Sequence, residues 1–348
     1  MSRLMRSRVH LFSLMVALCA AAGTLDAWLA TELPEYVPQD YTQWRYVLET
    51  AAHWLCGGMM FWAFEIFYVP SRLGVWIRHM HFLAAIAVKS LISVAIVVLT
   101  SWIGQLIIAQ SASLAFLARP EFHRTLSLAL ALIIVLQTSL QITRILGARN
   151  LVNFVLGRYR APVREDTIFM FLDLAGSTSL AERLGDEGVQ ALITSFFFDI
   201  SKPIVEHGGQ VHRYVGDQVV VTWPLKDSSD NLRAIECCFA IRQLVEALSD
   251  KYLHRFGAAP SFRIGLHGGP VVISQIGDQI QKLSYFGDTV NTAARIEQQC
   301  KALNSWMLIS SELLSRTRLP PAYRSQCLGN VQLRGREHPT ELFTIICT

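Results

Sequence analysis

Two patterns of hydrophobic residues divide the chain into halves. Before residue 150, long apolar stretches alternate with short polar segments, and each stretch is long enough to cross a bilayer as a helix, which takes about 20 residues. The stretches are Leu11–Ala30, Tyr46–Tyr68, Phe82–Ala109 and Leu126–Leu146. After residue 166 the apolar segments are shorter and repeat with the period of strands or of amphipathic helices. The pattern predicts an α-helical transmembrane domain of four helices followed by an α+β domain.

The order of elements in the second half predicts one sheet covered by helices. We expect strand 167–173, helix 179–206, strands 210–215 and 218–223, helix 228–254, strands 261–273 and 283–287, and helix 289–303. A ferredoxin-like core, with helices over an antiparallel sheet, has the order strand, helix, two strands, helix, strand. The predicted domains are therefore a transmembrane domain over 1–146, a cytoplasmic connector over 147–166 and a globular domain over 167–348.

Composition and charge agree with a membrane protein. The chain has 348 residues, of which 52% are hydrophobic, and this is too apolar for an ordinary soluble protein. Arginines precede the first apolar stretch, at Arg3, Arg6 and Arg8, whereas segment 31–42 after it is acidic. The positive-inside rule then places both termini and the globular domain in the cytoplasm, below a plasma or inner membrane. An alternative interpretation makes Met1–Gly23 a cleaved signal peptide.

The net charge of +4 does not indicate a nucleic-acid partner. Residues 1–166 hold 14 Lys+Arg against 9 Asp+Glu, while residues 167–348 hold 17 against 18, so the excess belongs to the membrane half and to its topology. Inside the apolar stretches, Glu65 and Lys89 lie near the cytoplasmic ends of the second and third, which predicts a buried ion pair. His53 fits either a packing histidine or a haem or metal ligand, and the pattern favours packing.

The strand 167–173 delivers a carboxylate to a turn that suits a phosphate. Alternation places Phe169, Phe171 and Asp173 on one face of the strand. Gly176 lets the chain turn into the next helix, whose first backbone amides attract anions. The candidate phosphate-binding residues are Ala175, Gly176, Ser177 and Thr178. On its own this segment is equally well explained as an ordinary loop between a strand and a helix.

Two further motifs supply partners for Asp173. Asp217 lies at the tip of a hairpin between strands 210–215 and 218–223. If strands 167–173 and 210–215 are neighbours, both carboxylates reach one edge of the sheet and share Mg²⁺ or Mn²⁺. Asn291 and Arg295 lie four residues apart on one helix face. An amide suits a hydroxyl, and a guanidinium suits phosphate oxygens.

Together these motifs resemble the class III nucleotide cyclases, the catalytic domain of adenylate and guanylate cyclases. The segments that carry the resemblance are Phe171–Thr178, Tyr214–Asp217 and Phe286–Arg295, and Arg263–Gly269 and Gln332–Gly335 are similar to later strands of the family. Three motifs in the same order are far more specific than one. The resemblance covers about 167–347, and we see none for the membrane half.

The resemblance implies a metal-dependent reaction on ATP. Asp173 and Asp217, with the Leu174 carbonyl as a further ligand, would hold two Mg²⁺ or Mn²⁺ ions per site. One ion would activate the ribose 3′-hydroxyl, and the other would hold the triphosphate while the hydroxyl attacks the α-phosphorus and pyrophosphate leaves.

The same resemblance assigns the remaining residues and the assembly. Asn291 would orient the ribose, and Arg295 would stabilise charge on the transferring phosphate. Arg334 resembles a basic residue that contacts the outer phosphates. Family members take the metal ligands of each site from one subunit and the Asn/Arg pair from the other. Since this chain carries both sets, a homodimer with two sites is implied.

The residues that would select the base depart from the family pattern. Adenylate cyclases usually carry Lys and Asp or Thr at these positions and guanylate cyclases carry Glu and Cys, whereas this chain has Arg213 and Ser284. Adenine offers an acceptor at N1 and a donor at N6, which these side chains complement. We therefore predict a membrane-anchored adenylate cyclase. The alternatives are a guanylate cyclase and a catalytically silent nucleotide-binding receptor, which would be marked by loss of a metal Asp or of the Asn/Arg pair.

Overall fold

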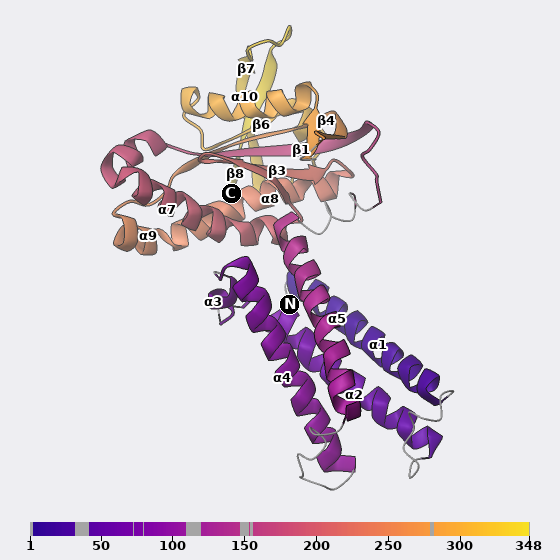
Figure 1. Ribbon diagram of the computed structural model, residues 1–348. Helices are drawn as coiled ribbons and strands as arrows, with labels where there is room; N and C mark the ends of the chain where they lie inside the picture. Colours follow the sequence, from indigo (N-terminus) through magenta and orange to yellow (C-terminus); the bar gives the residue numbers. More distant parts are fainter. Residues whose placement is uncertain are drawn as a thin grey trace. The chain divides into compact units, whose positions relative to one another are not determined.

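The computed structural model describes residues 3–31, 42–71, 73–78, 80–108, 120–146, 153, 156–278 and 282–347. The chain divides into two compact units, Met1–Val152 and Asn153–Thr348, and Figure 1 shows the elements of each. Segments 32–41 and 109–119 lie outside the described residues. They connect the predicted apolar helices, and their charges entered the prediction of topology. Most of the first part of the predicted connector, at 147–152 and 154–155, also lies outside the described residues.

The N-terminal unit is helical at every predicted apolar stretch. Its elements are α1 (Arg3–Thr31), α2 (Gln43–Ala63), the π-helix η2 (Phe64–Tyr68), α3 (Val75–Arg78), α4 (Phe82–Ile108) and α5 (Pro120–Leu146). Within the described residues two segments of 22 residues, Arg8–Leu29 and Phe82–Ile103, are long and apolar enough to cross a membrane, and the apolar part of α5 is shorter. Length and composition thus show two candidate spans rather than four.

A buried polar cluster joins three helices of this unit. Lys89 Nζ lies 2.8 Å from Glu65 Oε1, with the two side chains 1% and 3% exposed, so the predicted ion pair is confirmed. Gln137 Nε2 of α5 donates to the same oxygen at 3.0 Å. Glu65 lies in the π-helix η2, a local geometry that is frequent at functional sites. His53 Nε2 is 3.5 Å from Ser101 Oγ, which supports the packing interpretation of this histidine.

The C-terminal unit is an α+β domain with a mixed sheet. Its core elements are β1 (Val163–Leu174), α7 (Ser177–Glu206), β2 (Gln210–Val215), β3 (Gln218–Pro224), α8 (Ser228–Ala247), α9 (Ser249–Phe256), β4 (Phe262–Ile276), β5 (Lys282–Phe286) and α10 (Asp288–Ala302). The chain ends with β6 (Met307–Ser310), α11 (Ser311–Ser315), β7 (Tyr323–Val331) and β8 (Thr340–Cys347). The predicted order of elements is confirmed, but the helix expected over 228–254 is two helices that meet at Leu248.

The sheet has the strand order β2-β3-β1-β4-β6-β8-β7, with β5 paired to β4. Two details differ from the prediction. The sheet is mixed rather than antiparallel, because β6 runs parallel to β4. In addition, β1 pairs with β3 and β4 instead of β2. The hairpin β2–β3 brings its returning strand next to β1, and β2 lies one strand further out.

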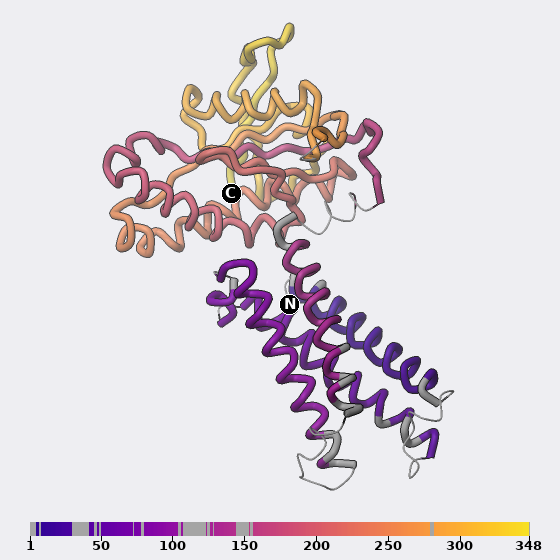
Figure 2. The backbone as a smooth tube through the Cα atoms, in the orientation of Figure 1, coloured from indigo at the N-terminus to yellow at the C-terminus, as the bar shows by residue number. Residues whose placement is uncertain are grey.

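Helices cover the two faces of the sheet unequally. In Figure 2, α7, α8 and α9 lie along one face and α10 along the other. The main core packs α7 and α8 against the β1 face formed by Ile168, Met170 and Leu172. Phe169 and Phe171 belong to a separate cluster on the opposite face, together with Ala293 of α10. The predicted alternation along β1 is therefore confirmed, and Asp173 extends the face on which α10 lies.

The buried ion pair of the N-terminal unit yields a stability prediction. Replacing Glu65 with Leu leaves the Lys89 charge buried without its carboxylate, which should lower the unfolding free energy by about 3–5 kcal/mol. The double variant Glu65→Leu/Lys89→Met should lose much less, since no charge remains to be desolvated. Thermal denaturation of the full chain in detergent measures both. Equal losses in the single and double variants would contradict a buried charge pair.

Candidate functional site

Asp173 lies where the central strand of the domain ends. β1 is buried continuously from Thr167 to Leu172 because strands flank it on both sides and helices cover both faces. Asp173 itself is only partly buried and pairs with Gln218 of β3 on one side and with Arg263 of β4 on the other. Two ladders therefore fix the position of this carboxylate.

Asp217 reaches the same edge of the sheet from the β2–β3 hairpin. Val215 pairs with Gln218, so Gly216 and Asp217 form the two-residue turn, in which Gly216 adopts the left-handed φ of 61° that hairpin turns of this length require. Gln218, the residue that follows Asp217, pairs with Asp173 of β1. The predicted meeting of the two carboxylates is therefore supported, although β3 rather than β2 is the neighbour of β1.

Two carboxyl groups lie close together at this edge, and their proximity affects the ionisation of Asp173. The pKa of Asp173 is raised to about 6, first by burial and then by the charge of Asp217, while Arg263 opposes the shift. Burial removes water from the charged form, and a like charge nearby penalises it further. A carboxylate in this position gains more from a bound cation than an exposed one does.

The segment after Asp173 forms a tight turn into α7. Gly176 caps the helix with a left-handed φ of 75°, and α7 begins at Ser177, two residues before the predicted start. The backbone amides of the first turn, at Ser177 and Thr178, are among those that an α-helix leaves without intrahelical partners. The amide of Ala175 instead donates to the Ser261 carbonyl at 2.8 Å, and Leu174 is buried.

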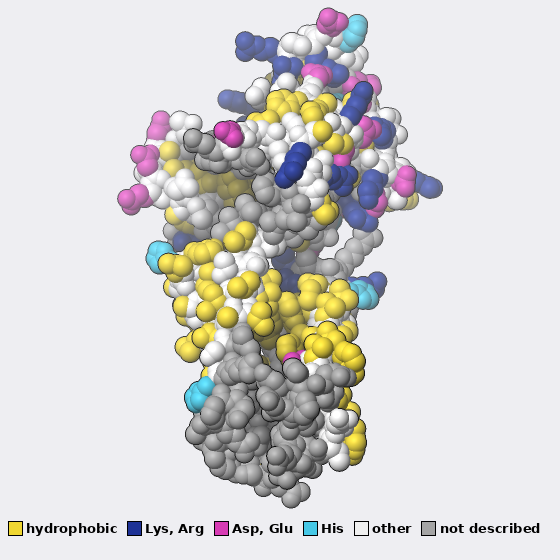
Figure 3. All heavy atoms as spheres, turned by 45° about the vertical axis from the view of Figure 1, so that its right-hand side comes forward, with side chains coloured by type: hydrophobic (Ala, Val, Ile, Leu, Met, Phe, Trp, Pro, Cys, Tyr) yellow, Lys and Arg dark blue, Asp and Glu magenta, His cyan; other side chains and the backbone are white. Residues whose placement is uncertain are grey.

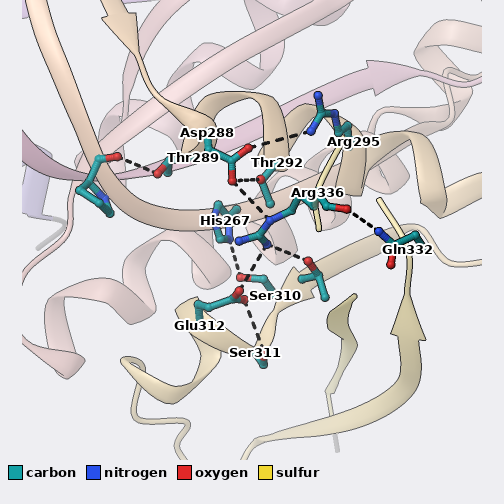
Figure 4. A network of polar contacts seen from close by, with 12 residues as sticks. His267, Asp288, Thr289, Thr292, Arg295, Ser310, Ser311, Glu312, Gln332 and Arg336 are labelled. Atoms are coloured by element: carbon teal, nitrogen blue, oxygen red, sulfur yellow. Dashed lines mark hydrogen bonds and ion pairs between the residues drawn. The ribbon is translucent and has the colours of Figure 1, made fainter. Parts of the chain in front are cut away.

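Helix α10 carries the predicted amide and guanidinium. Asn291 is exposed, and Arg295 lies one turn further along with a side chain that is 28% exposed. Figure 4 shows Arg295 beside Asp288, and its Nη1 is 4.0 Å from Asp288 Oδ1. That nitrogen is buried and has no hydrogen-bond partner among the described residues. Arg334 is exposed in the turn between β7 and β8.

The predicted residues form two separate groups within one chain. In the described part of the chain, no hydrogen bond or ion pair joins Asp173 or Asp217 to Asn291 or Arg295. The two positions expected to select the base lie on different strands, with Arg213 opposite Val220 and Ser284 opposite Ser274. Their chain neighbours His212 and Tyr285 meet, with ring centroids 4.7 Å apart.

The sequence interpretation missed a third acid at this edge. Glu297 of α10 is 5% exposed, and its pKa is raised to about 7, first by burial and then by the charge of Asp173, with Arg263 acting in the opposite direction. Gly265 makes room for it, because a Cβ there would collide with the Glu297 backbone. The available signal was helical spacing, since Glu297 follows the buried Ala293 by four residues. An acid on a buried helix face could have been singled out on that basis.

The chemistry of the edge fits a hard divalent cation. No group of three or more His, Cys, Asp or Glu side chains among the described residues is placed to hold a metal ion. Magnesium, however, is usually held by only one or two carboxylates and completes its shell with water and substrate phosphates. Asp173 and Asp217, whose charges repel across a partly buried edge, meet that requirement.

Comparison with known proteins identifies the domain that holds this edge. Residues 160–346 match the family described as the adenylate and guanylate cyclase catalytic domain, which is more than half of the chain. The chain belongs to this family. The α+β unit is thus a class III cyclase catalytic domain, and the helical unit precedes it.

Individual relatives agree with this assignment. Adenylate cyclase 2 of Rhizobium meliloti (strain 1021) is 42% identical over 197 residues, which cover 57% of this chain and 54% of that protein. Adenylate cyclase 1 of the same organism is 28% identical over 193 residues, covering 54% and 28%. The chain thus spans about half of the first relative and less of the second. A bacterial light-regulated adenylyl cyclase shares the fold, with a TM-score of 0.52, 23% identity and coverage of 61% of this chain and 62% of that one.

The raised pKa of Asp173 predicts an effect of pH on the stability of the cyclase. Its pKa of about 6 lies above the usual 3.8, so the folded state holds this proton more tightly than the unfolded state does. Stability is therefore lost as the pH rises from about 4 to about 6 and does not change further above that range. At pH 7.5 without metal, Asp173→Asn should raise the midpoint of thermal unfolding by about 2–4 °C, a value that allows for the partial exposure of the group.

The measurement is thermal unfolding of the full chain in detergent with a chelator. The gain should disappear below about pH 3, where the wild-type carboxyl is largely protonated in both states. The exposed Asp186 provides the matched control, and Asp186→Asn should leave the midpoint unchanged. A lower midpoint for Asp173→Asn at pH 7.5 would show that this carboxylate stabilises the fold, contrary to the prediction.

Proposed function

We propose that this protein is a membrane-anchored adenylate cyclase that converts ATP to cyclic AMP and pyrophosphate. The observation that carries the proposal is the meeting of Asp173 and Asp217 at one partly buried edge, directly before the turn into α7. The identity to a relative named adenylate cyclase 2 supports the choice of reaction and substrate. This chain carries both predicted metal-binding carboxylates, Asp173 and Asp217, and both predicted catalytic side chains, Asn291 and Arg295.

Asp173 and Asp217 are the proposed ligands for two Mg²⁺ or Mn²⁺ ions, with the carbonyl of Leu174 as a third contribution. When bound, divalent cations lower the pKa of an attacking hydroxyl and neutralise charge on phosphates. With the ions bound, the two aspartates would hold the reacting end of the nucleotide next to the first turn of α7. There the Ser177 and Thr178 amides donate hydrogen bonds to phosphate oxygens, and Gly176 forms the turn that presents these amides. The amide of Ala175 is not available to the phosphate because it donates to the Ser261 carbonyl. Ala175 therefore only helps to shape the turn.

Asn291 and Arg295 act on the other side of the nucleotide. The exposed amide of Asn291 orients the ribose through hydrogen bonds. Arg295 stabilises the negative charge that develops on the transferring phosphate. Support comes from the partly exposed side chain of Arg295, whose Nη1 has only a long ion pair with Asp288 and no hydrogen-bond partner among the described residues. Arg334, exposed in the nearby β7–β8 turn, contacts the outer phosphates.

We further propose that two chains build each site. The aspartate pair and the Asn291/Arg295 pair have no bonded contact within the described chain, and each chain carries both sets, so a head-to-tail homodimer contains two complete sites. A second observation supports this assembly. Apolar side chains on β2, β4 and β5 are exposed in the single chain, namely Tyr214, Val215, Val272, Ile276 and Phe286, as expected of a surface that a second copy covers.

ATP is preferred over GTP at this site. Arg213 and Ser284 complement the acceptor N1 and the donor N6 of adenine, whereas a guanidinium cannot satisfy the N1 and N2 donors of guanine. A mismatch of this kind costs about 1–3 kcal/mol when buried. Because neither residue belongs to the usual adenylate or guanylate pattern, cyclic GMP formation is the alternative that the assay must include.

The helical unit is the proposed membrane anchor, with four spans formed by α1, α2 with η2, α4 and α5. Two of them pass the length and composition criterion. All four expose large apolar side chains, for example Leu14 at 56%, Leu48 at 60%, Leu83 at 77% and Leu132 at 64%. Figure 3 shows such side chains over much of the visible face of this unit. Lipid rather than water suits this surface, and both termini and the cyclase domain then lie in the cytoplasm.

The proposal predicts cyclic AMP formation by the purified full chain. With Mn²⁺ and equal concentrations of ATP and GTP, cyclic AMP should be the main product. Asp173→Asn and Asp217→Asn should each lower the rate by more than about 100-fold, because each removes a charged ligand from the reacting centre. Predominant cyclic GMP would make the protein a guanylate cyclase. No product from either nucleotide, with the protein folded and dimeric, would leave only a silent nucleotide-binding receptor.

A further inference from the structure

Arg336 bridges two carboxylates next to the proposed catalytic arginine. Its Nε lies 3.3 Å from Asp288 Oδ2, and its Nη1 lies 3.4 Å from Glu312 Oε1. The same Nη1 donates to Thr340 Oγ1 at 2.7 Å. Figure 4 shows this side chain at the centre of the network, between α10 and α11. The Arg336 side chain is 25% exposed, whereas Asp288 is 57% and Glu312 45% exposed, so the network is only partly shielded from solvent.

Asp288 forms ion pairs with two arginines, a short one with Arg336 and a long one with Arg295. Its Oδ2 accepts from Thr292 Oγ1 at 3.2 Å and pairs with Arg336. Its Oδ1 lies 4.0 Å from Arg295 Nη1, which is too far for a hydrogen bond. That nitrogen is the buried donor without a hydrogen-bond partner among the described residues. Arg295 is therefore held by this acid only through a long ion pair without a hydrogen bond.

The turn that carries Arg336 lies beside Arg295. Gly335 has a left-handed φ of 74°, and a Cβ on it would lie 3.4 Å from Arg295 Nη2, which is an ordinary van der Waals distance. The backbone of this turn thus lies next to the guanidinium. Arg336, one residue later, ties the turn to α10 through Asp288 and to α11 through Glu312. The Arg336 side chain therefore influences both the position of the turn and the availability of Arg295 for other contacts.

From this geometry we infer that Arg336 is a positioning residue, which occupies Asp288 so that Arg295 stays free to bind a substrate phosphate. A carboxylate without a partner would attract the nearest guanidinium, because charge-assisted pairs between them are strong and can be bidentate. A small rotation would close the 4.0 Å gap between Asp288 and Arg295. Arg295 would then be held away from the substrate. The inference rests on the proposed function, since it assigns Arg295 to the transferring phosphate.

The decisive comparison is between a single variant and its rescue. Arg336→Gln in the full chain should lower kcat/KM for cyclic AMP formation by about tenfold, as expected for coupled groups in one network. Arg336→Gln/Asp288→Asn should recover most of the loss, because the acid that captures Arg295 is neutral. If Arg336 only stabilised the turn, removing a second contact would not help. A double variant as slow as Arg336→Gln would overturn the inference.

Two controls keep the comparison specific. Arg316→Gln breaks an exposed ion pair with Asp166, 3.1 Å long, outside this network, and should leave kcat/KM unchanged. Asp288→Asn alone should be no faster than the wild type. Asp288→Asn could raise the rate of the wild type by the same factor as it raises the rate of Arg336→Gln. The rescue would then be unrelated to Arg336, and the inference would fail.

A binding measurement separates this inference from the proposed function. Isothermal titration with α,β-methylene-ATP, in which the link between the α- and β-phosphorus cannot be cleaved, reports the contact of Arg295 with the α-phosphate without turnover. Arg336→Gln should weaken the affinity by about tenfold, and the double variant should restore it. If the wild type forms no cyclic nucleotide, the proposed function fails, yet this titration series still tests whether Arg336 frees Arg295. If the wild type and Arg336→Gln bound this ligand with equal affinity, the inference that Arg336 frees Arg295 would be contradicted.

Discussion

The arrangement of the cyclase domain depends on holding two like charges together at the end of a buried strand. β1 lies at the centre of the sheet, and its ladders with β3 and β4 leave Asp173 no freedom to move away from the Asp217 hairpin. Burial, and then the charge of Asp217, raise the pKa of Asp173 to about 6. Groups whose ionisation is disfavoured in this way are candidates for function rather than stability. A cation at this edge would offset the repulsion that the fold imposes.

Helix α10 provides the complementary half of the chemistry and is fixed equally firmly. The missing side chain at Gly265 lets its backbone approach β4 closely. This contact buries Glu297 toward the aspartates, while Asn291 remains exposed and Arg295 partly exposed. Asp288 and Arg336 then link the start of the helix to the β7–β8 turn. One helix thus stabilises the fold on its buried side and presents the proposed substrate contacts on the other.

The N-terminal helical unit follows a different physical rule. Its helices expose leucines to their surroundings, and they bury one charged cluster, in which Glu65 contacts both Lys89 and Gln137. A cluster of this kind fixes which helices are neighbours, because any other arrangement would leave a charge without its partner.

Local patterns in the sequence predicted much of this structure. The alternation along 167–173, the hairpin at Gly216 and the helical spacing of Asn291 and Arg295 depend on neighbouring residues, and each was readable from the chain. The pairing of β1 with β3 instead of β2, and the parallel β4–β6 pair, depend on how distant segments assemble. Glu297 and Arg336 were missed for the same reason. Their partners lie on other elements, and only the folded chain brings them close. The roles of Arg213 and Ser284 stay predictions.

The most direct test of the account asks whether two chains build one site. Asp173→Ala and Asn291→Ala chains should each be inactive, and co-expression should recover about a quarter of wild-type cyclic AMP formation, since half of the dimers are mixed and each has one intact site. Differently tagged chains purified in two steps would confirm that mixed dimers are present. If those mixed dimers remained inactive, the aspartate pair and the Asn291/Arg295 pair would have to act within a single chain, and the account would be wrong.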